Sequence, residues 1–495
     1  MSNLAVFSKA PPQDKGFRYR PKRPDMTWVE YLQMLLHIAA EIEHALMVQY
    51  LYAAYSLGGD QVPQGERQRV AGWRNSILAV AKEEMGHLLT VQNVLTCLGA
   101  PPNLARSNFP WDKHFLPFNF ALRPANKTAI ACYVFAEMPL TKAFHLPEAP
   151  TVPMEMRYKR FLDTDRPHIA KLARLNSADE EPHTVGLVYE TIIDLIGDRT
   201  RIPDSAFDSR SYPVQASWDD WGRGYRPDPY LVDSEGYRTQ DGKTAAVDKR
   251  KSIEASAHDA NVMIDKVATR TECVKALQAL SAQGEALDYG RDTEGLPSHF
   301  DRFLEIYQDI VDIEQSKAGW SPCRDVALNP TTVEALGEGN DGAYLENETT
   351  RTWGLLFNVR YRLLLGYLGH TFRLARQPAP GGPNLRGITM HRVFGEMYNI
   401  KTLSTLLMAM PIGADAAGPR AGPPFEMPYT LELPPGDTET WKVHLAMIDD
   451  SRSLCTTLLS LDPAHAAYLK TQMQLDSQTA DWLRSIIATA PRKDA

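Results

Sequence analysis

The segment EIEHALMVQYLYAAYSL, residues 41–57, places an acidic side chain in the middle of an apolar helical face. On a projection at about 100° per residue, Glu43 lies at the centre of an apolar stripe. The other members of the stripe are Leu32, Leu36, Ala39, Leu46, Met47, Tyr50, Ala54 and Leu57. The polar neighbours His37, Glu41 and His44 fall on the opposite side. Because burying an unpaired charge is costly, Glu43 needs a cation, a proton or a dense set of hydrogen bonds.

The segment EEMGHLLTVQNVLTCLGAPP, residues 83–102, repeats the arrangement on a second predicted helix. With Glu84 at the origin, His87 lies at about −60°, on the same face. The apolar residues of this face are Trp73, Ile77, Val80, Ala81, Leu88, Val91, Leu95 and Leu98. A carboxylate and an imidazole one helical turn apart can converge on one metal ion.

The Glu-x-x-His pattern is weak by itself, because two other copies occur. Glu41-x-x-His44 lies on the predicted polar face, and Pro182 interrupts the helix at Glu180-x-x-His183. A salt-bridged or protonated core glutamate is the alternative to a metal ligand at Glu43. Two neighbouring helices that both turn an acidic residue inward favour the metal site.

The composition limits the class of protein. The chain has 495 residues, enough for two or three ordinary domains or one large domain with insertions. Its net charge of −8 and the lack of Lys/Arg runs predict no nucleic-acid partner. The N-terminus lacks the apolar core of a signal peptide, and charged residues interrupt the most apolar helical stretch, so we expect no membrane partner. Five scattered cysteines fit neither a disulfide framework nor a zinc site and predict a cytoplasmic protein.

The predicted fold class is mainly α. Punctuation by glycine and proline and the helical periodicity predict helices at about 27–57, 73–98, 183–196, 252–285, 298–310, 353–375, 388–410 and twice within 438–490. The predicted organisation is an N-terminal arm (1–26), a helical bundle (27–310) with an aromatic-rich insertion at about 200–250, a C-terminal helical part (311–430) and a terminal helical extension (431–495).

Several blocks resemble one known family in the right order. The two segments quoted above, then VGLVYETI, AQGEA, SHFDRF, FNVRYRLLLGYL and LMAMPIG…AGPPFE, resemble the ferritin-like domain of the violacein and rebeccamycin-type imine dimer synthases. The resemblance covers residues 27–428. It implies a ferritin-like four-helix bundle with extra C-terminal helices, in which two helices each give a Glu and two others each give a Glu-x-x-His.

The resemblance also implies a metal-ligand set. Carried over by position, the metal ligands are Glu43, Glu84, His87, Glu190, Glu285 and His299, and the catalytic residues among these are Glu43, Glu84 and His87. Glu285 and His299 are not three residues apart, so the fourth helix must be interrupted between them. Periodicity supports His299 and gives little help for Glu190 or Glu285. Glu137, in the segment FAEMPL, is the main alternative to Glu190, and His258 is a weaker alternative for the last pair.

The expected function is that of a non-heme di-iron enzyme. Two iron ions, with manganese as the alternative, would use dioxygen as co-substrate to oxidise a small amino-acid-derived or aromatic substrate in secondary metabolism. A homodimer and an electron donor are further candidate partners. The family carries a large additional N-terminal region, whereas this sequence starts almost at the ferritin-like part, so a stand-alone oxidase or oxygenase is expected rather than imine coupling. An imine dimer synthase-like coupling enzyme, a ferroxidase-like iron-handling protein and a scaffold without a working site remain as alternatives.

Overall fold

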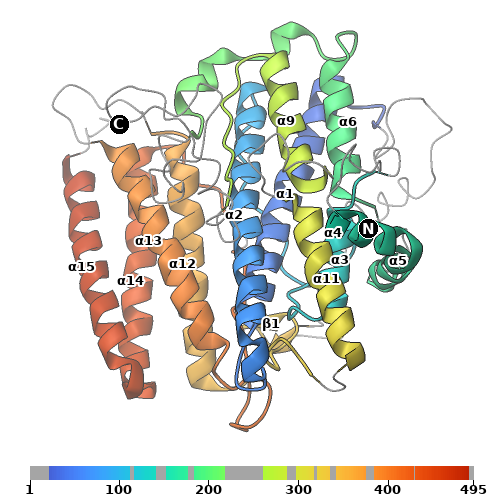
Figure 1. The fold of residues 1–495 in the computed structure, drawn as a ribbon. Helices are drawn as coiled ribbons and strands as arrows, with labels where there is room; N and C mark the ends of the chain where they lie inside the picture. The colour runs from blue at the N-terminus through green and yellow to red at the C-terminus, as the bar shows by residue number, and fades with distance from the viewer. Residues whose placement is uncertain are drawn as a thin grey trace, which may run out of the picture.

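The structure is a computed structural model, in which residues 22–111, 116–140, 152–176, 183–217, 260–286, 297–316, 320–334, 342–374, 384–428 and 430–489 are described. It is dominated by helices, as predicted (Figure 1). The helices are α1 (Trp28–Ser56), α2 (Arg67–Cys97), α3 (Lys127–Ala136), α4 (Val152–Arg160), α5 (Arg166–Leu175), α6 (Val185–Gly197), α9 (Arg270–Glu285), α11 (His299–Ser316), α12 (Glu348–Thr371), α13 (Leu385–Leu407), α14 (Asp437–Leu461) and α15 (Ala466–Thr489). Two short strands, β1 (Pro330–Thr331) and β2 (Ala343–Tyr344), pair in parallel.

The helices α1 and α2 pack against each other along their length and carry the first two predicted metal-site segments. A capping box begins α1: the Thr27 hydroxyl accepts the backbone N–H of Glu30, and the Glu30 carboxylate accepts that of Thr27. Gly58 and Gly59, with φ of 93° and 112°, follow the last turn of α1. Glycine adopts such values without strain, so both glycines suit the sharp turn toward α2.

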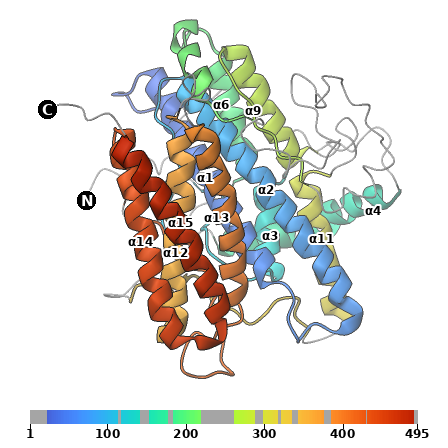
Figure 2. The same ribbon diagram turned by 90° about the vertical axis from the view of Figure 1, so that its left-hand side faces the viewer.

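The other two helices of the bundle are each split in two. α3 packs against α11, and α6 packs against α9, so the third helix position is shared by α3 and α6 and the fourth by α9 and α11. Figures 1 and 2 show α9 and α11 following one another alongside α2. The interruption predicted between Glu285 and His299 is present, since α9 ends at the first residue and α11 begins at the second.

The predicted helix over 252–285 is wrong in its first half as far as the structure describes it. Residues 251–259 lie outside the described residues, and residues 260–268 are not helical and lie against α2. Side chains of α2 replace helical hydrogen bonds here: Asn93 donates to the Asp265 carbonyl, and Thr90 accepts the Asp265 N–H. A Cβ at Gly86 would lie only 2.4 Å from the Met263 carbonyl oxygen, so this glycine permits the close approach.

The last four helices form a second group of packed helices. α12 packs against both α13 and α14, and α14 packs against α15 (Figure 2). The predicted boundary between residues 430 and 431 therefore runs through one packed unit. Its core holds a buried ion-pair cluster, in which Arg360 lies 2.8 Å from Glu396 and 2.7 Å from Asp476. Most of the aromatic insertion predicted at 200–250 lies outside the described residues.

α12 covers part of the face of α1 that was predicted to be polar. His44 is fully buried, and its Nε2 atom lies 2.5 Å from the Tyr361 hydroxyl of α12. The assignment of His44 to a solvent-facing side is therefore wrong, because a later part of the chain packs there. Across the described residues, no helix combines the length and apolar character needed to cross a bilayer.

Candidate metal centre

The centre of the cluster is Glu84, which places one carboxylate oxygen beside each of two imidazoles. Its Oε2 atom lies 2.9 Å from Nδ1 of His87, and its Oε1 atom lies 3.0 Å from Nδ1 of His299. The two rings are stacked, with centroids 5.3 Å apart. All three side chains are buried, and their ligand atoms lie within 4.8 Å of one another. Their spacing suits the binding of a metal ion.

Two further carboxylates flank this arrangement, one on each side. Oε2 of Glu43 lies 3.6 Å from Nδ1 of His87, and Oε2 of Glu137 lies 3.7 Å from Nδ1 of His299. Both carboxylates are buried. The cluster thus has two similar halves, each with one imidazole and one outer carboxylate, and Glu84 is shared between them.

A tyrosine holds each outer carboxylate. The Tyr189 hydroxyl donates to Oε1 of Glu43, and the Tyr50 hydroxyl donates to Oε1 of Glu137, both at 2.5 Å. Each bond fixes one oxygen and leaves the other directed at the imidazole. Among the described residues, Oε2 of Glu43 is buried without a hydrogen-bond partner. Nδ1 of His299 is likewise buried, and the atoms beside it are the carboxylate oxygens of Glu84 and Glu137. Buried polar atoms of this kind are rare unless something else binds them.

The far nitrogens of both imidazoles are also occupied. Nε2 of His299 lies 2.9 Å from the Glu83 carboxylate, which Arg302 contacts through both terminal nitrogens. Nε2 of His87 lies 2.9 Å from Oε1 of Gln283. An Nε2–H donated outward leaves Nδ1 as the free lone pair, directed into the cluster. Outer partners of this kind orient histidines that bind metals.

Glu285, the last residue of α9, completes the set of buried carboxylates. It lines a small cavity together with Glu43, Glu84, His87 and Glu137. The cavity measures about 10 Å³, roughly the room that one water molecule needs. Two glycines make space for the carboxylates: a Cβ at Gly186 would lie 2.0 Å from Oε2 of Glu285, and one at Gly284 would lie 3.1 Å from Oε2 of Glu137.

The cluster holds more negative charge than its imidazoles balance. Burial and the charge of Glu84 raise the pKa of Glu43 to about 8. Burial and the charges of Glu137 and Glu43 raise the pKa of Glu285 well above its usual range. Burial alone would lower the pKa of His87, but the charge of Glu84 and the nearby Glu43 raise it to about 10. These raised pKa values mean that bound protons neutralise part of the negative charge of the cluster. Bound cations could neutralise the same charge.

The residues fit a pair of divalent cations. Four ionised carboxylates (Glu43, Glu84, Glu137 and Glu285) would carry four negative charges, which two divalent ions neutralise. Carboxylate oxygens and imidazole nitrogens suit first-row divalent metals. The Glu83 carboxylate does not enter this count, because Arg302 already pairs with it.

The structure brings together five of the six residues that the resemblance implied: Glu43, Glu84, His87, Glu285 and His299. Glu190 is half-buried on α6 and does not line the cavity, which Tyr189 reaches instead. Glu137, the alternative named from the sequence, lies at the end of α3 beside His299. His258 lies outside the described residues.

Sequence reasoning missed the outer partners Glu83, Gln283 and Arg302. The adjacent acidic pair Glu83-Glu84 could have indicated Glu83. When one of two consecutive acidic residues lies on the inner face of a helix, the other one faces a neighbouring helix. The other two come from α9 and α11, and periodicity cannot pair distant segments.

Comparisons with known proteins show what the chain is similar to. Residues 36–213 match a family model described as Ferritin-like. The chain is 25% identical to dichlorochromopyrrolate synthase from Lentzea aerocolonigenes over 82% of its own length. It is 34% identical over 131 residues to 2-imino-3-(indol-3-yl)propanoate dimerase from Chromobacterium violaceum. The resemblance seen in the sequence is therefore confirmed.

The match covers 37% of the length of the first relative and 13% of the second, so the chain spans a minor part of each. Among solved structures, the chain is similar to a ferritin like protein from Caulobacter vibrioides, with a TM-score of 0.38 and 14% identity, over 76% of this chain and 96% of that one.

Proposed function

Because this chain contains a ferritin-like domain over residues 36–213, we propose that the cluster binds two iron ions and that the protein uses dioxygen to oxidise a small organic substrate. The observation that carries the proposal is the position of Glu84, whose two oxygens lie 2.9 and 3.0 Å from the Nδ1 atoms of His87 and His299. A buried carboxylate between two imidazoles on neighbouring helices is consistent with the Glu and His ligands that di-metal bundles use.

Each side chain has a distinct part in this proposal. Glu84 would be shared by the two ions. His87 and Glu43 would hold one ion, and His299 and Glu137 would hold the other. Glu285 would complete the set from the end of α9. The bound ions would supply the capacity to transfer electrons to dioxygen.

Apolar residues line the cavity beside the carboxylates. They are Leu46, Val185 and Leu280 of α1, α6 and α9, and all three are buried. Burial of the charged groups strengthens the electrostatic interactions among them. We propose that an organic substrate approaches the cluster beside these residues, between the start of α6 and the end of α9.

The substrate class is proposed from the relatives. The names of both relatives concern natural-product chemistry, and the name of the second includes an indolyl imino acid. We therefore propose an aromatic or amino-acid-derived compound as substrate. Coupling of imines is the alternative reaction, and product analysis distinguishes a dimeric product from an oxygenated or dehydrogenated monomer.

The test is metal loading of the full chain under anaerobic conditions, followed by oxygen uptake. We expect about two Fe²⁺ per chain in the unaltered protein, a loss of binding in Glu84→Gln, and normal binding in Glu41→Gln. Glu41 is the matched control because it lies on α1 two residues from Glu43 and contacts Asn103 instead of the cluster. Binding of less than one metal ion per chain, or equal loading of both variants, contradicts the proposal.

The small size of the cavity favours a second candidate function, oxidation of iron itself. A space of about 10 Å³ admits water, dioxygen or an ion without rearrangement, but not an aromatic compound. Oxygen uptake that follows added Fe²⁺ and is unchanged by any aromatic amino acid or imino acid supports this function. Uptake that requires the organic compound supports the first.

A further inference from the structure

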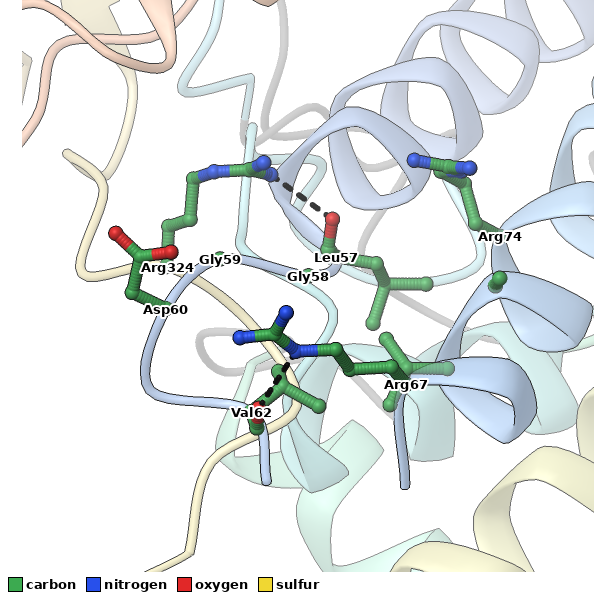
Figure 3. Close-up of a pocket in the computed structure, with 10 residues that line it drawn as sticks. Leu57, Gly58, Gly59, Asp60, Val62, Arg67, Arg74 and Arg324 are labelled. Carbon is green, nitrogen blue, oxygen red and sulfur yellow. Dashed lines mark hydrogen bonds between the residues drawn. The ribbon is translucent and has the colours of Figure 1, made fainter. Parts of the chain in front are cut away.

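A second cavity lies where the chain turns from α1 into α2, away from the carboxylate cluster. It has a volume of about 300 Å³, and three arginines line it: Arg67, Arg74 and Arg324 (Figure 3). Arg74 and Glu84 are ten residues apart on α2, which is about 15 Å along the helix axis. The cavity therefore belongs to a different part of the bundle from the proposed metal centre.

The charge of this cavity is positive, although the whole chain carries −8. Asp60 is the one acidic residue among those that line it, so three positive charges and one negative charge leave a balance of two positive charges. Within the described part of the chain, no carboxylate forms an ion pair with any of the three guanidiniums. Burial and the charge of Arg74 lower the pKa of Arg324, and the charge of Asp60 only partly opposes this shift.

Two of the arginines are held in place by backbone carbonyls. Nη1 of Arg324 donates to the carbonyls of Tyr55 and Leu57 at 3.2 and 2.9 Å, and Nε of Arg67 donates to the Val62 carbonyl at 3.3 Å. These bonds use one side of each guanidinium and leave the remaining N–H groups available. Figure 3 shows Arg74 on the opposite side from Arg324. Arg324 and Arg67 are thus held in place before a ligand arrives, which reduces the entropy cost of binding.

The loop beside Arg324 requires glycine. A Cβ at Gly59 would lie 3.0 Å from Cγ of Arg324, and φ at this position is 112°. A side chain here would push the arginine stem away from the cavity. The local sequence Gly58-Gly59 thus serves both the turn and the position of the guanidinium.

We propose that this cavity binds the phosphate group of a small phosphate monoester. A phosphate carries about two negative charges at neutral pH, which matches the balance of the cavity, and its oxygens point in several directions toward separate guanidiniums. A carboxylate has one charge and two oxygens in one plane, so it can satisfy fewer of the donors. The buried side chains of Leu57, Val62 and Val70 form an apolar floor for the organic part of the ester.

The test is calorimetric titration of the full chain, without added metal, with phenyl phosphate, inorganic phosphate and benzoate. We expect saturable binding of phenyl phosphate that weakens about tenfold in Arg74→Gln and in Arg67→Gln, the loss expected for one charge-assisted contact. Arg69→Gln is the matched control, because Arg69 lies on the same helix, is exposed and pairs with Glu66 at 3.5 Å. We expect its binding to be unchanged.

The comparison of ligands and variants shows which phosphate compound binds and whether it binds in this cavity. Tighter binding of phenyl phosphate than of inorganic phosphate supports the monoester, and unchanged binding in Glu84→Gln places it outside the carboxylate cluster. The proposal is overturned if phenyl phosphate does not saturate, if Arg74→Gln and Arg69→Gln lose the same affinity, or if benzoate or inorganic phosphate binds as tightly as the ester. Equal melting temperatures of the variants show that folding is not the cause.

Discussion

Nε2 of His299 lies 2.9 Å from Oε2 of Glu83, the residue directly before Glu84. Two consecutive acidic residues of α2 thus contact opposite nitrogens of one imidazole, since Glu84 lies 3.0 Å from its Nδ1. Glu83 is itself held by Arg302 and by the backbone N–H of Asn261. A fully bonded carboxylate on Nε2 fixes both the ring orientation and the tautomer that leaves Nδ1 free for a metal ion.

We therefore predict that Glu83→Gln lowers the affinity for Fe²⁺ by about 10- to 100-fold, the loss usual when an outer partner of a ligating histidine is removed. The measurement is competition with a coloured chelator of known affinity. Glu305→Gln is the control, because Glu305 lies on α11 but pairs with Arg157 at the surface. An affinity that does not change in Glu83→Gln would show that His299 is positioned by packing alone.

A second prediction decides between Glu137 and Glu190 as the third carboxylate ligand. Glu137 lies 3.7 Å from Nδ1 of His299 and lines the cavity, whereas Glu190 is half-buried and does not line it. We expect Glu137→Gln to lose about half of the bound metal or more, and Glu190→Gln to keep all of it. Metal content is measured by elemental analysis after gel filtration. Loss in Glu190→Gln alone reverses the assignment.

The parts of the site that could be predicted lie within long, regular helices. Glu43, Glu84 and His87 each sit in the middle of an apolar stripe of α1 or α2, so helical periodicity places them inward. Glu137 directly follows the last residue of α3, where no full turn follows to define a face. Glu285 likewise ends α9, so only the resemblance pointed to it.

The errors in the fold have a common physical cause, which is packing between segments far apart in the chain. His44 was predicted to face solvent because only α1 was considered, but Tyr361 of α12 covers it. Residues 260–268 follow a helical pattern in sequence, yet they are not helical, and α2 side chains bond the backbone of Asp265 instead. Tertiary contacts of this kind outweigh local propensity, which is worth less than about 1 kcal/mol per residue.

A third prediction concerns Gly186, at the first turn of α6. A Cβ there would lie 2.0 Å from Oε2 and 2.4 Å from Cδ of Glu285, so Gly186→Ala must displace this carboxylate. We expect loss of metal binding and a destabilisation of about 1–3 kcal/mol. Gly197→Ala is the matched control at the end of the same helix, because no atom lies within 4 Å of its Cβ position. Normal metal binding in Gly186→Ala would mean that Glu285 is not a ligand.

The fourth prediction concerns stability in acid and rests on two histidines buried in the C-terminal helices. Nδ1 of His370 lies 3.2 Å from Nε2 of His444, and both side chains are fully buried. Burial and the charge of Arg373 lower the pKa of His370 to about 3, and burial and the charges of His370 and Arg373 do the same for His444. Asp437, which lies 3.3 Å from Nε2 of His370, does not offset this, since it is half exposed.

The direction in which stability changes with pH depends on whether the folded or the unfolded chain binds more protons. Unfolded histidine has a pKa of about 6.5, so between pH 6.5 and about 3 the unfolded chain binds protons that the folded chain does not, and stability falls as the pH falls. We expect His444→Gln to be less stable than the unaltered chain at pH 7, but to lose less stability between pH 7 and pH 4. His391→Gln, at an exposed position of α13, should keep the full pH dependence. Urea unfolding at several pH values measures both quantities, and equal slopes for His444→Gln and His391→Gln would show that this pair does not control acid stability.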